Sequence, residues 1–181
     1  MSRAGCTLLW LGMTAAVAAA LPGAAGAKPA AGRAAESIRQ IALSQDKITQ
    51  FLAARPPLEA ILAGVPAGAA APDPGLLRRL NDTARKNGFA DYADYEAVAT
   101  NIVWILTGID PLSKKYVGVQ AVTKLEVADL LGDKTLSLKQ HKQLLEALHM
   151  QMLSAGPVKY AANVPLVIKF YDKLLAADAK N

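Results

Sequence analysis

The sequence predicts an all-α protein, a single-domain bundle of about five or six helices that follows a cleaved signal peptide. Apolar residues recur every three or four positions in one segment after another, and no stretch alternates convincingly with the period of two that a β-strand needs. Capping residues, glycines and prolines divide these segments into short helices. The connections between them are short, which favours antiparallel neighbours.

The first 27 residues have the order of a secretory signal peptide. Arg3 precedes an apolar run from Thr7 to Leu21, and small residues follow up to Ala27. The run has 15 residues, fewer than the ~20 that span the ~30 Å of a bilayer core, so we expect cleavage after Ala27. Cleavage within 18–20 and retention as an anchor are the alternatives. Export from the cytoplasm of a Gram-negative cell would place the protein in the periplasm.

The chain after residue 27 excludes several classes of protein. It contains no cysteine, so a disulfide framework and a thiolate metal site are ruled out. It keeps 19 Lys and Arg against 15 Asp and Glu, a net charge of +4, and these cations are scattered. A nucleic-acid binder usually carries a basic stripe with interleaved aromatics. We therefore expect no nucleic-acid binding, a weak contact with anionic envelope surfaces at most, and, without a nucleotide or calcium motif, no cofactor.

The folded domain is expected to span 44–181, after a flexible leader over 28–43. Ser44 is a good N-cap, and apolar residues recur at helical spacing until Pro56 and Pro57 end the first helix near residue 55. A short helical piece over 58–63 and a mobile, low-complexity linker over 64–72 come next.

The middle of the chain predicts one peripheral and one central helix. The pair Asp73-Pro74 supplies the N-cap and first turn of a helix that Gly88 ends. Over 92–106 apolar residues cover nearly the whole circumference, which is typical of a helix at the centre of a domain. Asp110-Pro111 then caps a short segment that runs to Gly118.

Three helices complete the prediction. Gly132 ends the first, Ser137 and Gln140 form a capping box at the start of the second, and Asn163 caps the last. Their expected core faces are, in order, Val122, Leu125, Ala128 and Leu131; Leu138, Leu145, Leu148 and Met152; and Val164, Val167, Ile168, Tyr171, Leu174 and Leu175.

Four short motifs carry a resemblance to a known family. They are Gly88-Phe89, Asn101-Ile102, the turn Gly108-Ile109-Asp110-Pro111, and Asn163 at the start of the last helix. With these motifs the chain resembles, over residues 44–175, a family of small exported helical proteins of unknown function from Gram-negative bacteria. The resemblance implies export and an α fold, and it implies no activity.

A first candidate binding surface lies at the start of the central helix. Tyr92 and Tyr95 stand among acidic residues, and a tyrosine offers both apolar area and a hydroxyl group. The acids also suit the positive end of a helix dipole, and Tyr95 falls on the core stripe, so a purely structural role is the alternative. Asn101 and Trp104 in the same helix are further candidates. The amide of Asn101 would contact a ligand or pair inside the protein.

A second candidate is a weak metal site at His149 and Met152. Imidazole and thioether ligands suit soft copper, and these two residues share one face of a helix. The alternative is that Met152 fills the core while His149 lies at its boundary. His141 is eight residues from His149, which does not match a zinc-protease motif.

Polar residues are largely explained by caps and surfaces, which favours a non-catalytic binding or interaction module for an envelope protein or a small ligand. The first alternative is a hydrolase-like enzyme that uses the dispersed carboxylates of Glu96, Asp110 and Glu126 as acid or base. The second is a structural component of the envelope. An open apolar groove would support binding, and paired carboxylates in a deep pocket would support an enzyme.

Overall fold

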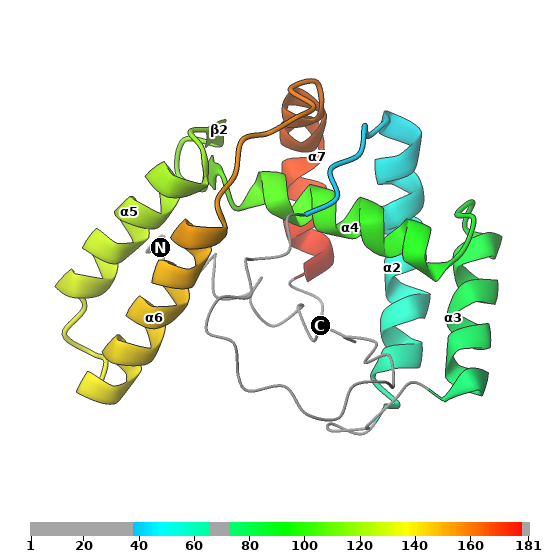
Figure 1. Ribbon diagram of the computed structural model, residues 1–181, viewed down its shortest axis with the longest axis horizontal. Helices are drawn as coiled ribbons and strands as arrows, with labels where there is room; N and C mark the ends of the chain where they lie inside the picture. Colours follow the sequence, from blue (N-terminus) through cyan, green and yellow to red (C-terminus); the bar gives the residue numbers. More distant parts are fainter. Residues whose placement is uncertain (1–37, 66–72, 179–181) are drawn as a thin grey trace, which may run out of the picture.

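The computed structural model describes residues 38–65 and 73–178, and these form a helical bundle with one small β-hairpin (Figure 1). The predicted all-α, single-domain fold is confirmed. The predicted signal peptide and most of the predicted linker lie outside the described residues. In chain order the elements are α2 (Gln45–Leu62), α3 (Pro74–Lys86), α4 (Tyr92–Leu106), β1 (Ile109–Asp110), β2 (Lys115–Tyr116), α5 (Val119–Gly132), α6 (Leu138–Ser154) and α7 (Asn163–Asp178).

The core forms around α4, as its apolar circumference predicted. Helices α2, α3 and α7 pack on α4, while α5 and α6 lie side by side at one end of the molecule (Figure 1). Apolar residues of α2, α3, α4 and α7 make one continuous cluster. None of the helices in the described part of the chain is long and apolar enough to span a membrane.

Helix α2 continues through Pro56 and Pro57, so the prediction that these residues end it is wrong. Each proline removes an N–H donor from the helix and costs up to about 3 kcal/mol in a helix interior. Both prolines lie on the exposed side, however, and the buried side runs uninterrupted from Phe51 through Ala54 to Leu58. Burial of that side on both flanks of the prolines offsets their cost.

Residues 38–43 form an extended segment packed against the domain, which we call the strap. The leader predicted over 28–43 is therefore wrong for these six residues. Leu43 is buried in the core, and Ile38 and Ile41 pack against it. The composition that suggested flexibility belongs to the earlier part of the leader, whereas the strap has three large apolar side chains to bury.

The segment from Asp110 to Gly118 was predicted to begin with a cap and first turn at Asp110-Pro111, but the structure shows a β-hairpin there. Strands β1 and β2 pair antiparallel, with Ile109 opposite Tyr116. The carboxylate of Asp110 accepts hydrogen bonds from the backbone N–H groups of Leu112 and Ser113, at 3.3 Å each, and Lys114 has a positive φ of 53°. These features reverse the chain, because an aspartate that bonds its own turn competes with helix formation.

Candidate functional site

The tyrosines at the start of α4 belong mainly to the core. Tyr95 is buried, and its ring stacks on Phe51 with centroids 5.4 Å apart and meets Phe89 edge to face at the same distance. Tyr92 is half-buried and stacks on Tyr95 at 5.9 Å. Its hydroxyl donates to Glu96, and burial followed by that carboxylate raises the pKa of Tyr92. Tyr92 is thus neutral at ordinary pH and already has a hydrogen-bond partner.

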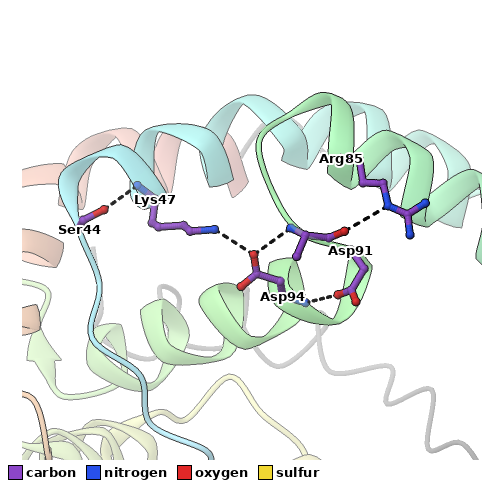
Figure 2. A network of polar contacts seen from close by, with 6 residues as sticks. Ser44, Lys47, Arg85, Asp91 and Asp94 are labelled. Carbon is purple, nitrogen blue, oxygen red and sulfur yellow. Dashed lines mark hydrogen bonds and ion pairs between the residues drawn. The ribbon is translucent and has the colours of Figure 1, made fainter.

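The acidic residues beside these tyrosines connect α2 with the start of α4 and the loop before it (Figure 2). Asp91 caps α4 by accepting from the backbone N–H of Asp94 at 2.8 Å. Asp94 in turn binds the ammonium of Lys47 on α2 at 2.9 Å and accepts from the N–H of Ala90 at 3.1 Å. The hydrogen bond from Lys47 is the main cause that lowers the pKa of Asp94. This cluster therefore joins α2 to the loop before α4, and these contacts explain the acids by the fold itself.

Asn101 also has an internal role, because it binds the main chain of the strap. Its Oδ1 accepts from the N–H of Ile41 at 3.0 Å, and its Nδ2 donates to the carbonyls of Arg39 at 2.9 Å and Ala97 at 2.8 Å. The predicted alternative in which this amide pairs inside the protein is the one that the structure shows. Both amide hydrogens are occupied, so none is left for a ligand.

Asn163 repeats this arrangement from α7, a role that its predicted function as a helix cap did not include. Its Oδ1 accepts from the N–H of Leu43 at 2.8 Å, and its Nδ2 donates to the carbonyl of Ile41 at 2.8 Å. The strap is thus held by one buried amide from α4 and one from α7. We call this pair of asparagines the amide clamp.

Trp104 is buried near the end of α4, and its indole Nε1 has no hydrogen-bond partner among the described residues. Three of the four predicted binding residues, Tyr95, Asn101 and Trp104, are therefore in the interior. The structure does not bring the four residues together on an open surface.

A different surface stands out on the hairpin of α5 and α6, where the predicted core faces are wrong at several positions, although Val122 and Leu148 are buried as predicted. Helix α5 buries Thr123 and Glu126 in place of Ala128 and Leu131, and Glu126 is only 1% exposed. The hydroxyl of Thr123 accepts from the amide of Gln151 on α6 at 3.0 Å. The contact between the two helices is thus partly polar, and several of their apolar side chains are left on the outside.

An open groove of about 680 Å³ runs along α6, lined by the exposed Leu138 and the half-buried Leu145 and Met152. Of the predicted core face of α6 only Leu148 is buried, while Leu138 is 89% exposed and Leu131 on α5 is 66% exposed. Leu153 and Met150, near the end of α6, are exposed as well, but they and Leu131 do not line the groove. The groove is lined by Val127, Leu138, His141, Lys142, Leu145, Glu146, His149 and Met152.

His149 and Met152, the weak metal candidates, both lie along this groove, with His149 exposed and Met152 half-buried. A ring nitrogen of His141, Nε2, is 2.9 Å from the carbonyl oxygen of Leu130, which ties α6 to the end of α5. Within 38–65 and 73–178 no group of three or more His, Cys, Asp or Glu side chains is placed to hold a metal ion.

The three carboxylates considered for catalysis lie on separate elements. Glu96 is in the second turn of α4 and Asp110 is in β1, so about 15 Å of helix α4 separates them. Glu126 is buried in α5, and the oxygens of Asp110 are used by its own turn. Partial burial raises the pKa of Glu96, but much of this side chain remains at the surface and is not set in a deep pocket.

Comparison with known proteins finds no family model, no curated protein and no solved structure that matches the chain. The resemblance to small exported helical proteins of Gram-negative bacteria therefore stays a prediction from the sequence.

Proposed function

We propose that the protein is a non-catalytic interaction module of the periplasm, exported by its first 27 residues, and that it binds its partner through the groove along α6. One observation carries the binding role. The α5–α6 hairpin has a partly polar contact between its helices, and its open groove is lined by the exposed Leu138 and the half-buried Leu145 and Met152. Large exposed apolar patches on soluble proteins are typical of interaction sites.

The shape of the groove favours a helical partner. Its lining residues on α6 run from Leu138 to Met152, which corresponds to about 21 Å of helix. A helix pair buries little apolar surface by itself, and stable bundles add a third or fourth helix across such a face. An added helix lying 8–10 Å away would cover Leu138, Leu145 and Met152 together.

Site-specific photo-crosslinking tests this function. A photoreactive amino acid replaces Leu145 in the groove or, as the matched control, the exposed Arg79 on α3, and the protein is produced in a Gram-negative host with its own leader. We expect a defined adduct from position 145 and none from position 79. Equal labelling at the two positions, or none at 145, would reject the groove as a binding site. The denatured mass should equal that of residues 28–181, and a mass that retains residues 1–27 would reject export by cleavage.

A further inference from the structure

The apolar row in the groove has a symmetry that points to its occupant. Leu138, Leu145 and Met152 are spaced by seven residues, the repeat that keeps two helices in contact along their length. If an identical helix packs antiparallel with its Leu145 against this Leu145, then Leu138 of each copy faces Met152 of the other. The row is therefore complementary to itself.

The charges that line the groove are complementary to themselves in the same register. Lys142 lies three residues before Leu145, and Glu146 lies one residue after it, on the same rim by helical geometry. A twofold axis through the Leu145 contact keeps the two rims on the same side. It brings Lys142 of one copy within about 3 Å, measured along the helix axis, of Glu146 of the other. The twofold symmetry creates this pair of opposite charges twice.

We infer that the partner bound in the groove is helix α6 of a second copy of this chain, so that two α5–α6 hairpins form an antiparallel four-helix interface. This inference rests on the proposed function of the groove. The helices of the described chain that could fill it, α2, α4 and α7, already turn their apolar faces into the core. Both ends of α6 would be covered in this dimer. The end with Leu138 lies against the end with Met152 of the second copy, and the reverse holds for the other contact.

Paired charge reversals test the register on the mature protein. Lys142→Glu and Glu146→Lys each place like charges at both contacts of a homodimer, so we expect each variant alone to dimerise at least ten-fold more weakly than the wild type in analytical ultracentrifugation. Mixing the two variants restores opposite charges at both contacts. We therefore expect a heterodimer in native mass spectrometry, where the two variants differ in mass. Arg79→Glu on α3 makes an equal charge change away from the groove and should dimerise like the wild type.

The same measurements contradict the inference clearly if it is wrong. A wild-type chain that stays monomeric at 100 times the concentration used for the variants, or a mixture that forms no heterodimer, would overturn it. A variant that simply misfolds would show lost helicity in circular dichroism, and mixing would not rescue it, so Leu145→Gln then serves as a second disrupting variant.

The crosslink from position 145 separates the two proposals. An adduct of twice the chain mass supports both, and an adduct with another protein overturns the dimer alone. The absence of any adduct overturns both.

Discussion

Removing the side-chain amide of Asn163 should lower the stability of the fold far more than removing the side-chain amide of Gln40, a residue of the strap. In Asn163→Ala, the buried N–H of Leu43 and the partly buried carbonyl of Ile41 both lose their partner. An unsatisfied buried polar group costs about 1–3 kcal/mol, so we expect the free energy of unfolding to fall by about 2–4 kcal/mol. Urea denaturation followed by circular dichroism measures this difference.

Gln40→Ala is the matched control for this prediction. Gln40 also makes two hydrogen bonds, to the carbonyl of Pro157 at 2.8 Å and from the N–H of Lys159 at 2.7 Å, but both are exposed. Water replaces the lost partners there, so the expected cost is below about 1 kcal/mol. Equal losses in Asn163→Ala and Gln40→Ala would refute the argument that burial of the clamp, and not the number of its hydrogen bonds, sets its contribution.

The remaining predictions concern acid stability and two glycines. Because Lys47 holds the pKa of Asp94 below its ordinary value of 3.8, the unfolded chain takes up this proton more readily than the folded chain. The contact therefore stabilises the fold at pH values above 3.8 and loses its effect as the pH falls through the lower pKa of the folded state. The variant Asp94→Asn should be less stable than the wild type near neutral pH and should approach it in acid. A difference in stability that does not depend on pH would contradict this. Gly108→Ala should destabilise the protein, since an added methyl group would overlap the ring of Tyr116, whereas Gly132→Ala, which meets only open space in α5, should stabilise it by roughly 0.5 kcal/mol. Thermal unfolding of the two variants measures this contrast, which equal shifts in melting temperature would disprove.

Sequence reasoning succeeded where local chemistry and burial agree. Ser44, Asp73 and the capping box of Ser137 with Gln140 begin their helices as predicted. Gly88 has a φ of 88° after α3, as a residue that ends a helix in the left-handed region should. The apolar spacing of α4 and α7 also identified the buried faces, because both helices are covered by neighbours along their length.

Sequence reasoning failed where contacts with a segment distant in the chain decide the local structure. The strap depends on Asn101 and Asn163, which lie 60 and 120 residues away from the backbone groups they bind. The run of apolar residues in the strap, Ile38, Ile41 and Leu43, was the available signal for a packed segment. Asn101 was recognised as unusual in an apolar helix, but nothing local to it indicates which backbone it would bind. Pro56 and Pro57 mislead for the same reason, since only tertiary burial of α2 outweighs their local effect.

The wrong prediction for α5 and α6 is the most informative one for function. An apolar stripe shows that a helix face needs covering, but it does not show which element covers it. Along α6 Leu138 is exposed and Leu145 and Met152 are only half-buried, while Glu126 occupies the interior of the hairpin. Each large apolar side chain left in water forgoes about 1.5–3 kcal/mol of burial. A hairpin whose inner face includes the polar Thr123 and Glu126, and whose groove leaves apolar surface in water, can bury that surface by association. We therefore expect this face of α6 to become buried in the assembly, because a partner helix, and not the rest of this domain, would cover it.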